Sequence, residues 1–393
     1  DQSLVSLYSE AIAGLGDGEG ELRARLLGQL AIELKYGPER QKRHSLSAEA
    51  LGIARRGGDQ LTLARALSAR IFAIEDPTTL VERLQMTAEL ETLAAALGHN
   101  ELGCLTARQR FVALLESGDA VGAERALARC AQLAAQLRVP FFDCFVRFVR
   151  TMWALMRGEP DAEQQIFSTF QAGVAIRLPQ AGNALGAQMF ELRARQGRLG
   201  EQLDAIRTAV KTHPNVSAFH AALVFSLCET GALDEAQEHM EQLIANDFSL
   251  PLDMNWPGTI NFLSEACGML RNRQAAKILY PRLKPVAEQV GVTAAVRCDG
   301  SLAHPAGILA SCLQQWADAE MHFEFALEVN DRIGARIASI RTRRAYASML
   351  IERNFASDHK RAADLISAGL GAAASIEMPA ETAKLENLRQ SLG

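Results

Sequence analysis

The amino-acid sequence predicts an all-α protein, a right-handed α-α superhelix (solenoid) built from helical hairpins. Three observations lead to this fold class. First, alanine and leucine dominate the 393 residues, whereas aromatic residues make up only 6%, and both dominant residues are good helix formers. Second, valine, isoleucine and threonine do not cluster into the alternating runs that are typical of strands. Third, a turn residue followed five positions later by alanine recurs along the chain.

The turn-and-alanine pattern indicates closely packed hairpins. Its four examples are Gly118 with Ala123, Gly231 with Ala236, Arg271 with Ala276 and Gln314 with Ala319. Where the two helices of a hairpin cross, a small side chain lets the backbones approach. A large side chain would overpack the crossing, at a cost of roughly 1–3 kcal/mol. In the last unit Gly307 precedes the turn, and Phe323 and Ala326 continue the stripe.

The turns repeat at a regular interval. They fall at 118, 158, 197, 231, 271 and 314, about 34–43 residues apart, which is typical of a solenoid of degenerate tetratricopeptide (TPR)-like helical hairpins. The segment 301–330 matches the TPR pattern best, and 216–247 matches it next. We therefore expect N-terminal degenerate helical repeats over 1–215 and C-terminal TPR-like repeats over 216–393, in one continuous solenoid.

The N-terminal elements can be placed more closely. We expect helices over 1–13, 19–36, 43–57, 59–74, 79–97 and 100–117, with loops at 14–20 and 75–79. Asp76 precedes Pro77 and reads as a polar cap at a helix start. The segment 296–310 departs from the expected pattern, because His304-Pro305 occurs where a longer unbroken helix would otherwise be expected.

Composition excludes several classes of protein. The net charge of −5 and the pI near 6.0 argue against nucleic-acid binding by this segment. The seven cysteines are odd in number and form no CxxC, so we expect reduced, mostly buried thiols in a cytoplasmic protein. The eight histidines are scattered, and Cys298 with His304 fits no standard metal motif, so we expect neither metal nor cofactor. No segment has the run of about 20 apolar residues that crosses a membrane.

Three stretches of the chain carry a family likeness. They are "LYSEAIAGLGDGEGELRARLLGQLAIELKYGPERQKRHSLSAEALGIARRGGD", "NDFSLPLDMNWPGTINFLSEACGML" and "LQQWADAEMHFEFALEVNDRIGARIASIRTRRAYASMLIERN". In this order they resemble the TPR-like C-terminal tail of large bacterial signal-transduction ATPases, in which an NTPase is linked to a nucleotide cyclase or a LuxR-type regulator. The resemblance implies that the tail binds a ligand or partner and restrains an output domain. The chain has no Gly-Lys dipeptide, hence no GxxxxGK[ST] phosphate loop, and its first residue is not methionine, so we expect a fragment of a longer protein.

Candidate binding residues lie in the C-terminal repeats. They are Asn255, Trp256, Arg297, His304, Asn330, Arg344 and Tyr346. Trp256 beside Asn255 suits a groove that holds a peptide or small molecule; alternatively, Trp256 is buried and Asn255 caps the next helix. The arginine-rich stretch 332–353 either binds an anion or forms a solvated helix paired with nearby acids.

The leading hypothesis for function is a non-catalytic regulatory module. A protein, a peptide or a small-molecule effector would bind the concave groove and shift the state of the protein's own upstream ATPase or output domain. The alternative is a stand-alone TPR adaptor for protein–protein interaction. A helical-array enzyme is a third hypothesis, which a pocket with two or more titratable groups within reach of each other would support.

Overall fold

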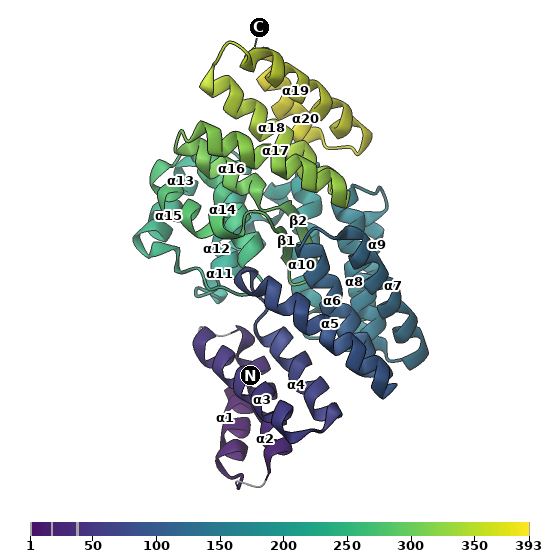
Figure 1. Cartoon of the computed structure of the whole chain (residues 1–393). Helices are drawn as coiled ribbons and strands as arrows, with labels where there is room; N and C mark the ends of the chain where they lie inside the picture. The colour runs from purple at the N-terminus through teal and green to yellow at the C-terminus, as the bar shows by residue number, and fades with distance from the viewer. Residues whose placement is uncertain (1, 17–18, 37–38, 393) are drawn as a thin grey trace. The chain divides into compact units, whose positions relative to one another are not determined.

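Helices form most of the chain, as predicted. The computed structural model describes residues 2–16, 19–36 and 39–392. The chain is 81% helical, with 20 α-helices in the described part, and consecutive helices pack on one another as in a helical solenoid (Figure 1). The predicted all-α fold class is therefore confirmed.

The chain divides into two compact units. The first contains residues 1–146 and 251–254, and the second contains 147–250 and 255–393. Helix α8 (Pro140–Arg157) contributes residues to both. The boundary predicted at 215 falls inside the second unit, in the connection between α11 (Leu203–Thr212) and α12 (Ser217–Glu229).

The first unit is a series of helices that pack in chain order. Besides the start of α8, its helices are α1 (Gln2–Ala13), α2 (Gly20–Glu33), α3 (Arg40–Gly57), α4 (Gln60–Ala73), α5 (Leu80–Leu97), α6 (Asn100–Glu116) and α7 (Ala120–Leu137), with short 3₁₀ turns at Leu34–Tyr36 and Pro77–Thr79. The helices predicted over 59–74, 79–97 and 100–117 agree with α4, α5 and α6 to within one residue at each end. Of the predicted loop at 14–20, residues 17 and 18 lie outside the described residues.

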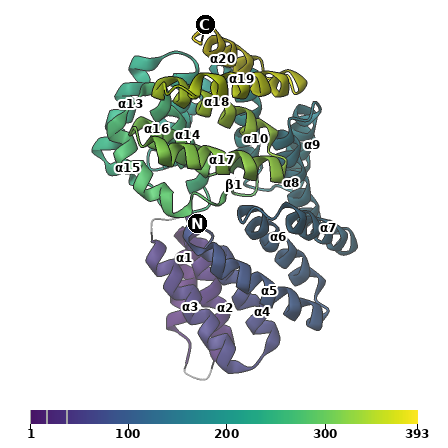
Figure 2. The same ribbon diagram turned by 45° about the horizontal axis from the view of Figure 1, so that its top comes forward.

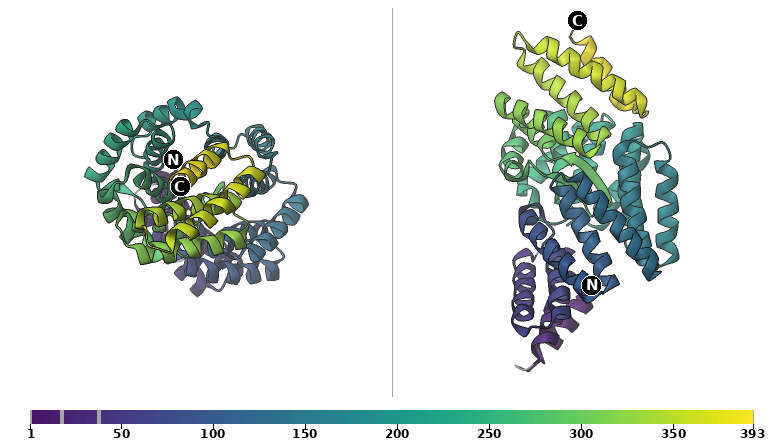
Figure 3. Two further views of the ribbon diagram at one scale, coloured as in Figure 1. Left: turned by 90° about the horizontal axis from the view of Figure 1, so that it is seen from above. Right: turned by 45° about the vertical axis from the view of Figure 1, so that its right-hand side comes forward.

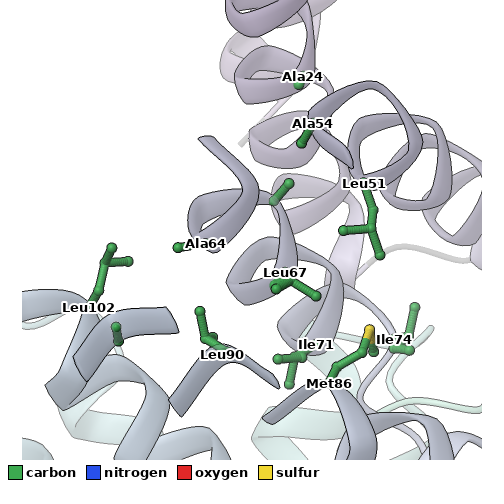
Figure 4. Packing of buried hydrophobic residues seen from close by; sticks show 12 residues of the cluster. Ala24, Leu51, Ala54, Ala64, Leu67, Ile71, Ile74, Met86, Leu90 and Leu102 are labelled. Atoms are coloured by element: carbon green, nitrogen blue, oxygen red, sulfur yellow. The ribbon is translucent and has the colours of Figure 1, made fainter. Parts of the chain in front are cut away.

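Alanine and leucine build the core of this unit. Ala64 and Leu67 of α4, Leu90 of α5 and Leu51 of α3 belong to one buried cluster (Figure 4). The helix start predicted at Asp76 is confirmed, because its side chain accepts a hydrogen bond from the Thr78 amide at 2.9 Å. Polar capping and small-residue packing thus act as the sequence indicates.

The second unit continues the series. Its helices are the end of α8, then α9 (Ala162–Ala175), α10 (Ala181–Gln196), α11, α12, α13 (Leu233–Ala245), α14 (Trp256–Leu270), α15 (Arg273–Leu283), α16 (Ala303–Cys312), α17 (Trp316–Ile333), α18 (Arg336–Arg353), α19 (Asp358–Ser375) and α20 (Pro379–Gln390), with 3₁₀ turns at Leu199–Gln202, Asp247–Ser249 and Lys284–Val286. Figure 2 shows α18, α19 and α20 side by side at the C-terminal end, where they contact one another.

The recurring turns have the conformation that a tight hairpin needs. All six positions have positive φ: Gly118, Gly158, Gly197, Gly231, Arg271 and Gln314. The alanines that follow four of them, Ala123, Ala236, Ala276 and Ala319, are 0% exposed. In α16, a Cβ built on Gly307 would lie 2.7 Å from the Phe323 ring of α17. The small residues therefore sit at helix crossings, as predicted.

The segment 296–310, which departs from the expected pattern in sequence, does not form one unbroken helix. Strand β1 (Val290–Thr293) pairs antiparallel with β2 (Arg297–Ser301), and α16 begins only at Ala303 (Figure 3). The reversal passes through Ala294 and Ala295, both with positive φ. Alanine rarely adopts this conformation and gives no turn signal, so the hairpin is hidden in the sequence.

The second unit closes on its own C-terminal helix. Helix α20 contacts α10 as well as its neighbours α18 and α19. A Cβ on Gly197, at the end of α10, would lie 3.1 Å from the Cβ of Ala380, and Lys384 of α20 reaches Glu229 of α12. Contacts between distant segments therefore supplement the packing of consecutive helices.

Candidate functional site

Every second helix from α10 to α20 contributes charged side chains to two ion-paired groups, which the charge of Arg341 links through Glu191, Glu265 and Glu381. We call the two groups together the alternate-helix network. Its members are Glu191 of α10, Glu229 of α12, Glu265 of α14, Arg297 and Asp299 of β2, His304 of α16, Arg341 and Arg344 of α18, and Glu381 and Lys384 of α20. The opposite charges within it are close to balanced. The hairpin repeat produces this arrangement, because it places the first helix of each hairpin on the same side of the stack.

Glu265 occupies the centre of one half of the network. Oε1 of Glu265 lies 2.8 Å from Nε2 of His304, and Oε2 of Glu265 lies 3.4 Å from Nη2 of Arg344. Arg344 also donates from Nε to Glu381 at 2.7 Å. Thr342 lies 3.2 Å from the other ring nitrogen of His304. The imidazole is therefore held at both nitrogens between α14 and α18.

Arg297 occupies the centre of the other half. Its guanidinium pairs with Asp299 and lies 3.9 Å from the ring centroid of Phe262. Glu191 lies 3.9 Å from Nε of Arg297 and forms an ion pair with Nη1 of Arg341 at 3.2 Å. The β1–β2 hairpin, which was not predicted, brings Arg297 and Asp299 to this position.

The network reaches solvent at its α20 edge. The Lys384 side chain is 31% exposed and lies 2.6 Å from Glu229 and 3.4 Å from Glu381. The side chains of Arg341 and Arg344 are 15% and 16% exposed, whereas that of Glu265 is 7% exposed. Water-borne ions can therefore reach the cationic groups more readily than the central carboxylates.

Burial and ion pairing shift the pKa values of the network in opposite directions. Burial alone would raise the pKa of Glu265, but the hydrogen bond and charge of His304 and the charge of Arg344 outweigh it and hold the pKa well below its usual range. Arg344 and Lys384 similarly overcome the burial of Glu381 and lower its pKa to about 2. At Asp299 burial prevails, aided by the charge of Glu191, and the pKa is raised.

A small cavity lies between Glu191, Asp299 and Arg341. Its apolar walls include Met152, Leu155, Met156 and Ile337, and its volume is about 10 Å³. Oδ2 of Asp299, which is buried, has no hydrogen-bond partner among the described residues. The cavity therefore suits a single water molecule.

The cavity bears on the enzyme hypothesis because two carboxylates meet in it. Titratable groups do lie within reach of each other there, as that hypothesis requires. However, Glu191 and Asp299 are ion-paired with Arg341 and Arg297, and the cavity is far smaller than the roughly 300 Å³ at the lower end of small-molecule sites. This cavity gives a substrate no room.

Three of the residues predicted for the site come together. Arg297, His304 and Arg344 all belong to the alternate-helix network. Trp256 is 2% exposed at the start of α14, so it is a buried residue, the second of the two alternatives given for it above. Asn255 occupies the N-cap position, but its side chain makes no capping hydrogen bond.

The other two predicted residues lie elsewhere. Asn330 is fully buried; it accepts a hydrogen bond from the Ser301 amide at 2.7 Å and lies 3.3 Å from Thr342. Asn330 therefore links the β1–β2 hairpin to α18 and supports the alternate-helix network indirectly. Tyr346 points to the other side of α18, where its hydroxyl donates to Glu320 at 3.1 Å and its ring stacks on Phe323.

The arginines of the stretch 332–353 differ in their surroundings. Arg341 and Arg344 enter the network, and Arg353 pairs with Glu320 and Asp358, whereas Arg332 is exposed beside Glu328. Pairing with acids is therefore correct for this stretch, but a uniformly solvated helix is not.

Sequence reasoning missed the acidic half of the network, in particular Glu191, Glu265, Asp299 and Glu381. A signal was available for Glu265, because it is the only charged residue in α14, "WPGTINFLSEACGML". A charge surrounded by apolar residues on every helical face must be buried, and a buried charge needs a partner.

The first unit has a buried charged cluster of its own. Lys35 lies 2.7 Å from Glu75 and 3.3 Å above the Phe72 ring, and Arg83 lies 2.6 Å from Glu116. Burial lowers the pKa of Lys35 to about 8. Since Lys35 is 1% exposed and Arg83 is 1% exposed, these groups are less reachable than the α20 edge of the alternate-helix network.

Comparisons with known proteins give no family for the chain. No helix in the described ranges is long and apolar enough to cross a bilayer. A scan against protein-family models finds no match, and a search of curated proteins finds no significantly similar sequence.

Proposed function

We propose that the chain is a non-catalytic regulatory binding module, of the kind that forms the tail of bacterial signalling ATPases, and that an anionic effector or partner segment binds at the α20 edge of the alternate-helix network. The observation that carries the proposal is the chain of ion pairs that joins Arg344 and Lys384 to Glu381 and Glu229. In this arrangement Glu381 occupies the place that a ligand carboxylate or phosphate would take.

Charge balance makes such binding a conformational event. The acids of the network already neutralise its bases, so an added anion can bind Arg344 only if Glu381 gives up its place. Glu381 lies on α20, in the first turn, and its displacement would loosen that helix from α18. A ligand that favours the displaced arrangement then shifts the population toward it, and an attached output domain can respond to the change.

A buried ion network is poorly explained by stability alone. Replacing buried ion pairs by apolar residues is often neutral or stabilising, whereas removing one partner is strongly destabilising. If a ligand takes the place of one partner in the network, ligand binding explains why the buried charges are present. The same mechanism would serve a stand-alone adaptor, and the identity of any attached domain separates the two.

The test measures anion binding to the whole chain and to Glu381→Gln. Calorimetric titrations with inorganic phosphate, a nucleotide and an acidic peptide would be run at constant ionic strength. We expect at least one of them to bind, with severalfold higher affinity for Glu381→Gln, because that variant frees Arg344 without removing it. The matched control is Glu328→Gln on the exposed face of α17, whose affinity should equal that of the unmodified chain.

Hydrogen exchange supplies the second readout. Saturating anion should speed amide exchange in α20 and leave α14 unchanged. Binding that is equal in Glu381→Gln and the unmodified chain, or no anion binding by either protein, would overturn the proposal.

A further inference from the structure

We propose that Cys267 and Cys312 form an oxidisable dithiol, a modification site at which a hydroperoxide converts two thiols into a disulfide between α14 and α16. The Sγ atoms of the two residues are 4.0 Å apart, and Cys267 Sγ also lies 3.0 Å from the carbonyl oxygen of Asn272. The site is independent of the anion site proposed above.

The packing of α14 on α16 brings the thiols together. A Cβ built on Gly268, next to Cys267, would lie 2.7 Å from Cγ2 of Ile308, one turn before Cys312. The helices therefore approach through a glycine, as closely as their side chains allow. Cys312 Sγ also lies 3.8 Å from the Cys267 carbonyl oxygen. A disulfide has an S–S bond of about 2.05 Å, so the sulfurs must move about 2 Å closer, a change within reach of side-chain rotation.

Accessibility decides which thiol reacts first. Cys267 is buried, whereas Cys312, the last residue of α16, is partly exposed. The hydrogen bond from the Cys267 thiol lowers the pKa of Cys312 despite burial, which favours the reactive thiolate there. Cys312 is thus the attacking sulfur, and Cys267 is the resolving one.

The reaction balances in two steps. The Cys312 thiolate attacks the peroxide, its sulfur takes one oxygen, and hydroxide leaves, so that a sulfenic acid forms. The Cys267 sulfur then attacks the Cys312 sulfur; the S–O bond breaks and water leaves with the thiol proton. In sum, two thiols and one hydrogen peroxide give one disulfide and two waters.

The first unit contains a matched pair that should not react. Cys104 of α6 and Cys130 of α7 have sulfurs only 3.5 Å apart, again beside a tight glycine, Gly103. Both cysteines are 0% exposed, so peroxide cannot reach them in the folded chain. A single thiol for comparison is Cys298, whose pKa is raised by burial to about 12.

The test is native oxidation followed by mass spectrometry. The folded chain would be treated with equimolar hydrogen peroxide, blocked with N-ethylmaleimide, denatured, blocked again with a heavier maleimide and digested without reduction. We expect a peptide that links Cys267 to Cys312, with Cys104 and Cys130 carrying the second label. Linkage of Cys104 to Cys130 first, or oxidation without a link to Cys267, would contradict the proposal.

Variants assign the roles. Cys267→Ser should leave a sulfenic acid at Cys312 that dimedone labels, and Cys312→Ser should abolish both the link and the label. Cys298→Ser should leave the link unchanged. A dimedone label on Cys267 in Cys312→Ser would reverse the assignment, and loss of the link in Cys298→Ser would overturn it. The result for the unmodified chain depends on no variant folding.

Discussion

Glu265 shows how one residue ties the repeats together. It is the single charged side chain of a 15-residue helix, yet it contacts α16 through His304 and α18 through Arg344. Because its pKa is held far below the usual range, the carboxylate stays ionised throughout the physiological range. Its charge is thus a structural element of the second unit.

Removing this charge should destabilise the second unit strongly. In Glu265→Gln the shape is kept, but His304 and Arg344 lose their ionised partner, so we expect the free energy of unfolding to fall by about 3 kcal/mol. Urea denaturation followed by circular dichroism measures the change. Glu328→Gln, which removes an exposed partner of Arg332, should change it by less than about 0.5 kcal/mol. Equal effects of the two substitutions would contradict this view of the network.

The same carboxylates predict an acid response. Glu265 and Glu381 both have lowered pKa values in the folded chain, that of Glu381 being about 2. The unfolded chain therefore binds more protons than the folded chain in acid, and the free energy of unfolding should fall as the pH drops from about 5 toward 2. Glu381→Gln should make this decline shallower. An unchanged slope in denaturation curves collected across this pH range would refute the assignment.

At this scale the sequence analysis named three of the ten members of the alternate-helix network. Arg297, His304 and Arg344 were predicted, because arginine and histidine are residue types that commonly bind ligands. Glu191 and Glu381 were not, because a lone acid on a mixed helix resembles a solvated one. Only the fold decides which of its faces meets α18.

At the scale of the helix and hairpin, small residues decide how closely elements pack. The alanines after the turns and Gly307 lie at crossings, and this pattern was readable because the spacing repeats. The β1–β2 hairpin was not readable, since its turn uses Ala294 and Ala295 with positive φ. Repetition made the helices predictable, and the hairpin occurs outside the repeat.

Two glycine substitutions should have opposite effects. In Gly307→Ala the new Cβ would lie 2.7 Å from the Phe323 ring, so we expect overpacking to cost about 1–3 kcal/mol. In Gly186→Ala, within α10, a Cβ meets nothing within 4 Å, and higher helix propensity should stabilise the chain by about 0.5–1 kcal/mol. Thermal unfolding measures the change in stability of each variant. Stabilisation by Gly307→Ala would contradict the prediction, because it would show that the helix crossing has room for a methyl group.

At the scale of the second unit, the pairing of Lys384 with Glu229 joins its last helix to a segment 155 residues earlier. The repeat period indicates stacking of neighbours but contains no information about such a return. The closure could therefore not be predicted from spacing, whereas the all-α architecture could.

Breaking the closure should release α20 selectively. In Lys384→Met the aliphatic stem is kept and the ion pairs to Glu229 and Glu381 are lost. Amide exchange in α20 should become faster, with α14 unaffected, in a hydrogen-exchange experiment read by mass spectrometry. Arg389→Met on the same helix, which loses only an exposed pair with Glu386, serves as control. Equal exchange in the two variants would show that Lys384 holds nothing in place.

The closure also limits how the second unit can change in length. In an open array each repeat touches only its neighbours, so copies can be gained or lost at little cost. Here α20 must meet both α10 and α12, and each first helix supplies charges that are matched elsewhere. Inserting or deleting one hairpin would misalign the contacts of α20 with α10 and α12 and leave a charged side chain of the network without its partner. A change in the number of hairpins should therefore destabilise this unit more than a substitution on its exposed surface.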